Sequence, residues 1–215
     1  LNTFSFDNHS YSQVKGVAMG TKMGPSYACL FMGHFEHLFL QQFRKPHPDL
    51  FKRYIDDCFA ITSQSLEETT EFIQALQVFH PSISFTYQIS AVSVSFLDIH
   101  IFLSHGHLRT SVHYKPTDTH AYLHYHSFHN PSTLNSIPYS QFLRLRRLCS
   151  DNRDFHEKSL EMIKFFQARH YPLPFLHQAL HRVQKQTREL CLRPQKNSQP
   201  LAVSFSPFNT TPPHG

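Results

Sequence analysis

Arg53-Tyr54-Ile55-Asp56-Asp57-Cys58-Phe59-Ala60-Ile61 is the stretch of this 215-residue chain on which the interpretation of its fold depends. Two adjacent carboxylates stand between apolar residues that suit short, half-buried strands. Aspartate tolerates tight turns, so the pattern predicts a β-hairpin with Asp56 and Asp57 at its tip. A solvated surface turn is the alternative, because aspartate is common in turns.

The two carboxylates are of the type that binds Mg²⁺. Carboxylate oxygens are ligands that Mg²⁺ prefers, and two-metal sites use several of them to stabilise the attacking and leaving oxygens of phosphoryl transfer. Successive side chains point to different faces of a strand or turn, so one aspartate is expected to be the principal ligand and the other to assist it. Asp56 and Asp57 are therefore the candidate catalytic and metal-binding residues.

Glycines recur at a four-residue spacing before the hairpin, at Gly16, Gly20 and Gly24. Pro25 follows them, at a position typical of the first turn of a helix. Apolar residues then recur at helical spacing and end before Pro46, which predicts a helix over residues 26–43 that packs under the hairpin. The glycines permit either a close approach of the backbone to a ligand or only a turn.

Several motifs together resemble a known family. Tyr54-Ile55-Asp56-Asp57 resembles the Y-x-D-D box of reverse transcriptases, and residues 13–25 resemble the glycine-rich segment that precedes the palm helix in these enzymes. Phe96-Leu97-Asp98 and Lys115-Pro116-Thr117-Asp118-Thr119 resemble stretches that Penelope-like retroelement polymerases carry after the box. The resemblance covers most of residues 1 to about 150, and it implies part of the RNA-directed DNA polymerase of a Penelope-like retrotransposon.

The resemblance implies roles for individual residues. Asp56 and Asp57 would hold Mg²⁺, with Mn²⁺ as a substitute, for template-directed nucleotidyl transfer. Lys115 would contact a backbone phosphate. The template base or the incoming dNTP would lie against residues of the glycine-rich segment, namely Gln13, Gly16, Met19 and Gly20. The implied partners are an RNA template, a DNA primer and, in the full-length parent, a dNTP.

The resemblance also implies that the catalytic site is incomplete. Family polymerases bring a further aspartate from a strand before the glycine-rich segment, and their nucleotide-binding fingers lie upstream as well. Nothing before Gly16 supplies that strand, and Asp7 lies too close to Gly16. The missing initiating Met also indicates a fragment. Because the upstream aspartate and the fingers are missing, we expect the chain as given to be inactive as an enzyme.

After the box the sequence predicts a helix and then strands. Ser65 and Glu68 have the spacing of a capping box at a helix start. Apolar residues alternate over residues 83–89 and again over 92–103, with a change of parity that is typical of a bulge. A further strand is predicted over 108–114. These strands predict a small antiparallel meander.

A basic helix is predicted to begin at Ser140, and it carries Arg144, Arg146 and Arg147. Apolar residues between the arginines allow the helix to pack on one side and to present charge on the other. Because guanidinium forks match phosphate oxygens, these arginines are expected to contact the nucleic-acid backbone. A solvated face with acidic neighbours is the alternative.

Two more helical segments are predicted from Phe155 and from Leu176, joined by a short turn that contains proline. Such a pair is typical of a helix-turn-helix nucleic-acid contact or of a polymerase thumb, and the sequence leaves both open. The predicted fold class is α+β, with a partial reverse transcriptase palm over residues 1–118 and a helical thumb or helix-turn-helix region over 119–193. Residues 194–215 have the composition of a disordered tail.

Composition limits the partners and the location. The formal net charge of +5 favours a polyanionic partner, for which nucleic acid is the simplest candidate. The four cysteines are far apart, which indicates neither a disulfide framework nor a zinc site beside the histidines of residues 120–129, and favours an intracellular protein, nuclear or cytoplasmic. No apolar run is long enough for a membrane span. A non-catalytic nucleic-acid-binding helical module remains the second hypothesis.

Overall fold

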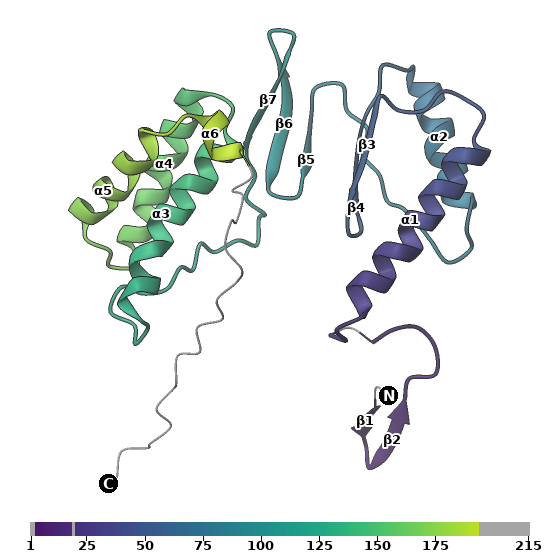
Figure 1. Cartoon of the computed structure of the whole chain (residues 1–215), viewed down its shortest axis with the longest axis horizontal. Coiled ribbons are helices and arrows are strands. Elements are labelled where there is room, and N and C mark those ends of the chain that lie inside the picture. The colour runs from purple at the N-terminus through teal and green to yellow at the C-terminus, as the bar shows by residue number, and fades with distance from the viewer. Residues whose placement is uncertain (1–2, 19, 194–215) are drawn as a thin grey trace. The chain divides into compact units, whose positions relative to one another are not determined.

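The structure is a computed structural model that describes residues 3–18 and 20–193 (Figure 1). Met19 and the tail predicted to be disordered, residues 194–215, lie outside the described residues. The chain divides into two compact units, residues 1–106 and 107–215. Helices and antiparallel strands occur in a mixed arrangement consistent with the predicted α+β class. Within the described ranges, no helix is both long and apolar enough to cross a membrane.

The first unit begins with a β-hairpin. β1 (Thr3–Phe6) and β2 (His9–Ser12) pair antiparallel. Asp7 and Asn8 form the two-residue turn, with φ angles of 49° and 58°. Asp and Asn adopt positive φ more readily than most residues, so this dipeptide between alternating residues is the signal for the hairpin.

Two helices form the core of the first unit. α1 (Gly24–Gln42) confirms the helix predicted over residues 26–43, with a proline in its first turn. α2 (Leu66–Val78) starts with the predicted capping box, since the Ser65 hydroxyl accepts a hydrogen bond from the Glu68 amide and the Glu68 carboxylate accepts one from the Ser65 amide. The residues buried between these helices are Phe35, Phe39, Phe72 and Leu76.

The predicted hairpin around the two aspartates is present. β3 (Leu50–Tyr54) and β4 (Asp57–Ile61) pair antiparallel. Phe51 of β3 packs against the α1–α2 core, and its ring lies 6.1 Å from that of Phe72 between centroids. The hairpin is therefore held against the helices, as the sequence predicted.

The strand predicted over residues 83–89 is wrong. This segment is irregular, and Ile83 and Phe85 pack against the α1–α2 core without a neighbouring strand. Gln77 of α2 donates a side-chain hydrogen bond of 2.9 Å to the Phe85 carbonyl oxygen. Alternating apolar residues indicate an extended segment with one buried face. They do not show that a neighbouring strand forms hydrogen bonds with its backbone.

The predicted bulge near residue 97 is also wrong. β5 (Ser93–Phe96) and β6 (Ile99–Ser104) form an antiparallel hairpin, with Leu97 and Asp98 as its two-residue turn. Leu97 has a φ of 54°. A turn between two strands and a bulge within one strand can produce the same change of parity in a sequence, so the pattern could not separate them.

The second unit combines β7 (His107–Val112) with helices α3 (Pro131–Leu148), α4 (Asn152–Gln167), α5 (Leu173–Gln184) and α6 (Arg188–Leu192). Its core contains fully buried side chains from three of the helices: Phe142, Leu145, Met162, Phe166, Leu176 and Val183. β7 packs on α3 and α4. The boundary between the two units therefore precedes β7, whereas the sequence placed a domain boundary at residue 118.

α3 begins earlier than predicted. Asn130 caps the helix, and its side-chain oxygen accepts a hydrogen bond of 2.9 Å from the Ser132 amide. Ser140, the predicted start, lies inside the helix, and its hydroxyl donates to the Ile137 carbonyl at 2.8 Å. The helix continues through Pro138, which is fully buried. Tertiary packing here outweighs the tendency of an internal proline to end a helix.

Candidate functional site

Asp56 and Asp57 lie at the tip of the β3–β4 hairpin. The register pairs Tyr54 with Asp57, so Ile55 and Asp56 form the two-residue turn and Asp57 begins β4. Ile55 has a φ of 57°, and all four residues are exposed. The predicted place of the aspartates at an exposed hairpin tip is confirmed, and their role as metal ligands stays a prediction.

An arginine fork attaches this tip to α1. Arg53 donates hydrogen bonds to both carboxylate oxygens of Glu36, and its Nη1 donates one of 2.8 Å to the Ile55 carbonyl oxygen. The Arg53 and Glu36 side chains are only 12% and 22% exposed. The hydrogen bond to Glu36 is the main cause that raises the pKa of Arg53. Such a two-pronged, partly buried ion pair fixes the position of the turn relative to the helix.

The tip fits part of a magnesium site. Asp56 and Asp57 are two exposed carboxylates, with the hard oxygen donors that Mg²⁺ prefers. Burial, followed by the charge of Glu36, raises the pKa of the Cys58 thiol beside them. Among residues 3–18 and 20–193, no three His, Cys, Asp or Glu side chains gather into a group that could hold a metal. Asp56 and Asp57 are therefore the carboxylates that the hairpin tip itself offers.

The predicted template- and nucleotide-binding residues lie in the loop between β2 and α1. Gln13, Gly16 and Gly20 are exposed there, and Gln13 Nε2 donates a hydrogen bond of 2.8 Å to the Lys15 carbonyl. Gly16 and Gly20 have φ angles of 78° and 89°, which other residues adopt only with strain. These angles favour the alternative in which the glycines permit the turn, and a binding role stays a prediction.

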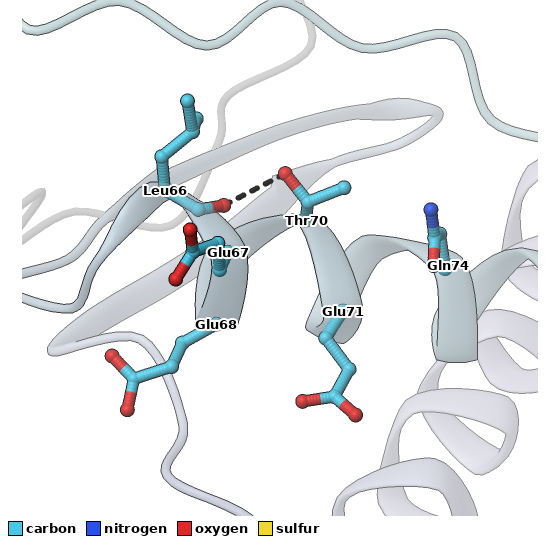
Figure 2. A pocket seen from close by; sticks show the side chains of 6 residues that line it. All are labelled: Leu66, Glu67, Glu68, Thr70, Glu71 and Gln74. Carbon is cyan, nitrogen blue, oxygen red and sulfur yellow. Dashed lines mark hydrogen bonds between the residues drawn. The ribbon is translucent and has the colours of Figure 1, made fainter.

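Figure 2 shows an open depression along α2, lined by Leu66, Glu67, Glu68, Thr70, Glu71 and Gln74. Two of its three carboxylates have structural partners, because Glu68 belongs to the capping box and Glu71 pairs with Lys45. Acidic side chains are also stabilising in the first turn of a helix. The depression is therefore explained by the start of α2 and does not point to a catalytic site.

Arg146, a predicted phosphate contact, is bound within its own unit. Its Nε donates a hydrogen bond of 3.1 Å to the Gln186 carbonyl, and its Nη1 donates one of 2.6 Å to Asn152 Oδ1. Its guanidinium carbon also lies 5.1 Å from the ring centroid of Phe155. These contacts join the end of α3 to the start of α4 and to the turn after α5, so the structure favours a structural role for Arg146.

Arg147 takes part in holding α6, a short helix that the sequence analysis missed. Arg147 Nε donates a hydrogen bond of 2.9 Å to the Cys191 carbonyl, and Arg188 Nε donates one of 3.1 Å to the Arg147 carbonyl. Thr187 caps α6 by accepting a hydrogen bond from the Leu190 amide. The capping threonine was the available sequence signal. Arg147 is otherwise exposed, so a phosphate contact remains compatible with its place.

The two other predicted backbone contacts also lie in the second unit. Lys115 is exposed at a turn in which the Asp118 amide donates a hydrogen bond of 2.8 Å to the Lys115 carbonyl. Arg144 is half-buried on α3. Burial raises the pKa of Tyr114 and of Tyr122, and the positive charge of Arg144 opposes this shift in both. Arg144 therefore lies within electrostatic reach of the loop after β7.

α5 presents a polar and basic face to solvent. His177, His181 and Lys185 recur at a spacing of four, the spacing of neighbours on one side of a helix, and all three are exposed. The exposed Arg182 extends over Tyr139 of α3, with 4.6 Å between guanidinium carbon and ring centroid. Neither α3 nor α5 contains an acidic residue. We call the exposed side chains His177, Gln178, His181, Arg182 and Lys185 the α5 face.

The sequence analysis missed the α5 face because it followed only the apolar positions of this helix. The signal was the lack of any Asp or Glu from residue 162 to residue 188.

Three imidazole rings gather beside the turn between α4 and α5. The ring centroid of His124 lies 4.6 Å from that of His170 and 5.6 Å from that of His126. Desolvation, followed by the charges of His170 and His126, lowers the pKa of His124. The Tyr125 amide donates a hydrogen bond of 2.9 Å to the Arg169 carbonyl in the same place. The loop before α3 is thereby fastened to the α4–α5 turn.

Comparison with known proteins bears on this second unit. Residues 121–181 match the family model of the animal helix-turn-helix domain. The matched range contains α3, α4 and most of α5, so the match supports the helix-turn-helix alternative for the region predicted over residues 119–193. No curated protein and no solved structure matches the chain.

Proposed function

We propose that the second unit binds nucleic acid through the α5 face. The observation that carries this proposal is an acid-free helix with an exposed basic face, and most of this helix lies within the range that matches the animal helix-turn-helix domain. In helix-turn-helix proteins the second helix of the motif lies in the major groove, and the first crosses the backbone. α4 and α5 follow each other in this order, joined by residues 168–172.

The side chains of the α5 face divide by chemistry into two roles. Arg182 and Lys185 supply the positive charges that neutralise phosphates, and such contacts give affinity without sequence preference. Gln178 and His177 lie nearer the start of the helix, where side chains of a recognition helix contact base edges. Lys115, Arg144 and Arg147 stay candidates for further backbone contacts, whereas Arg146 is not needed for binding.

Binding to a duplex of roughly 20 base pairs is expected to weaken as salt rises, because each lysine or arginine contact with a phosphate releases counterions. Charge reversal of the α5 face by Arg182→Glu with Lys185→Glu should lower the affinity about tenfold or more. It should also make the slope of log affinity against log salt shallower by about 2. Fluorescence anisotropy of a labelled duplex at several salt concentrations measures both quantities.

The matched control is Arg44→Glu with Lys52→Glu, which makes the same change in net charge at two exposed positions of the first unit. This control should leave most of the affinity intact. An equal loss in both double variants would show that binding depends on net charge alone and would remove the α5 face as the interface.

A second candidate function is favoured by the place of Asp56 and Asp57 at an exposed tip that the Arg53–Glu36 fork holds on α1. In this second candidate, the first unit forms part of the palm of an RNA-directed DNA polymerase that resembles those of Penelope-like retrotransposons. Mg²⁺, when bound, would stabilise the attacking and leaving oxygens of nucleotidyl transfer. Asp56 would be the principal ligand and Asp57 would assist it, while Gln13, Gly16 and Gly20 would face the template or the dNTP.

Primer extension on an RNA template tests this second candidate. A version of the protein that also carries the upstream family segment with its aspartate should extend a DNA primer with Mg²⁺ or Mn²⁺. Asp56→Asn should lower that activity by about a hundredfold or more, whereas Glu67→Gln on α2 should not. The 215-residue chain should be inactive, because two carboxylates only partly offset the repulsion between two divalent cations. Activity that survives Asp56→Asn would contradict the assignment.

A further inference from the structure

Phe128 stands apart from the other aromatic residues in the loop between β7 and α3. Tyr114 lies 4.5 Å from the ring of His120, Tyr122 lies 4.6 Å from Phe166, and Tyr125 lies 5.2 Å from Tyr171, all between centroids. Phe128 is fully exposed, and within the described part of the chain no other aromatic ring contacts it. The loop thus buries its tyrosines at least in part and leaves its phenylalanine in solvent.

The exposure of Phe128 is built into a defined turn. The Ser127 amide donates a hydrogen bond of 2.9 Å to the His124 carbonyl, and the His129 amide donates one of 2.8 Å to the Ser127 carbonyl. The side chains of Ser127 and His129 also form a hydrogen bond of 3.0 Å, and Asn130 then caps α3. An exposed phenylalanine forgoes the stabilisation that burial would give, so a ring presented by a hydrogen-bonded turn is available to a ligand.

The charges around this turn favour an anionic ligand. No aspartate or glutamate occurs from residue 119 to residue 150, and the four histidines of this range lie in the loop that carries Phe128. Arg169 lies beside the same loop, because its carbonyl accepts a hydrogen bond of 2.9 Å from the Tyr125 amide. Ser127 and His129, on either side of Phe128 in the sequence, are polar, so the ring does not continue an apolar run of residues. An unpaired base needs only one aromatic face for stacking, while its backbone is attracted by cationic surroundings.

We propose that Phe128 is a stacking platform for an unpaired base of single-stranded nucleic acid. This inference rests on the proposed binding of nucleic acid by the second unit, and it adds a contact that the α5 face does not provide. Base stacking on an aromatic side chain tolerates any sequence, because every base has a flat face. Phe128 would therefore favour strands with unpaired bases without selecting which bases they are.

The chain contains no tryptophan, so Phe128→Trp places a single fluorescent reporter at the turn. Oligonucleotides of about ten residues, oligo(dT) and oligo(rU), should quench its emission as they bind. An abasic strand of the same length should bind with at most slight quenching, since it has phosphates but no bases. Phe6→Trp, at an exposed site on β1, is the matched control and should not be quenched. Equal quenching by the abasic strand would overturn the proposal.

Affinity gives a second readout that does not depend on fluorescence. Phe128→Ala should weaken binding of single strands about tenfold and change duplex affinity less than about twofold, whereas Phe128→Tyr should keep both. Unchanged single-strand affinity in Phe128→Ala would overturn the proposal. So would emission of the Phe128→Trp variant that shifts with protein concentration alone, because the ring would then be covered by a second copy of the chain.

Failure of the proposed function has a different signature. If charge reversal of the α5 face leaves duplex binding unchanged while bases still quench the Phe128→Trp emission, the α5 interface fails and the stacking platform stands. If the α5 variants weaken duplex binding and no strand quenches the emission, the α5 interface stands and the stacking platform fails.

Discussion

Replacement of Phe166 by alanine is expected to lower the free energy of unfolding of the second unit by about 3–5 kcal/mol. The Phe166 ring is fully buried, and its centroid lies 4.6 Å from that of Tyr122, 5.2 Å from Tyr171 and 6.3 Å from Phe142. Its removal leaves a cavity between α3, α4 and the loop before α3. Because a small domain is stable by only about 5–15 kcal/mol, this loss is a large share of the total.

Hydrogen exchange of amides in α4 and α5 measures this effect in the second unit alone, which avoids treating a chain of two units as a single transition. Leu160→Ala is the matched control, because Leu160 lies on the same helix and is 44% exposed. It should cost less than about 1 kcal/mol. Similar costs for the two variants would show that Phe166 is not at the centre of this core.

Replacement of Arg146 by alanine is expected to lower the stability of the second unit by about 2–4 kcal/mol. Hydrogen bonds of charged groups contribute about 1.5–3 kcal/mol, and a cation–π contact contributes about 0.5–1 kcal/mol. The variant loses the bonds to Gln186 and Asn152 as well as the contact with Phe155. Arg146→Lys should recover only a small part, because an ammonium group lacks the planar fork that reaches several partners.

The control for Arg146 is Arg153→Ala. Arg153 is exposed and pairs with Glu157 one helical turn away, a contact worth about 0.3–0.5 kcal/mol. Hydrogen exchange near the end of α3 compares the two variants, and anisotropy with a labelled duplex measures their affinities. Weaker nucleic-acid binding by a fully stable Arg146→Ala protein would restore the phosphate contact that the sequence predicted.

The elements that the sequence predicted correctly are those whose signals are local. The capping box at Ser65 brings its donors and acceptors within three residues of each other, so it forms wherever a helix starts there. The Asp56–Asp57 tip depends on a short turn between two runs of strand-forming residues, and the neighbouring α1 depends on helical spacing of its apolar residues. The sequence therefore determined the candidate catalytic residues and their place at a turn.

Tertiary contacts decided the rest. The sequence around Arg146 is the same whether its side chain contacts a phosphate or another part of the protein. Only the folded structure brings Arg146 to the Gln186 carbonyl, 40 residues away. Residues 83–89 alternate like a strand, but Ile83 and Phe85 pack on the α1–α2 core, and the Gln77 side chain donates the hydrogen bond that the Phe85 carbonyl accepts. α3 continues through Pro138, and this proline is buried by the packing of the second unit. Partners distant in sequence set these outcomes. Most local propensities amount to a few tenths of a kcal/mol per residue, and packing of the whole helix offsets even the cost of about 3 kcal/mol for an internal proline.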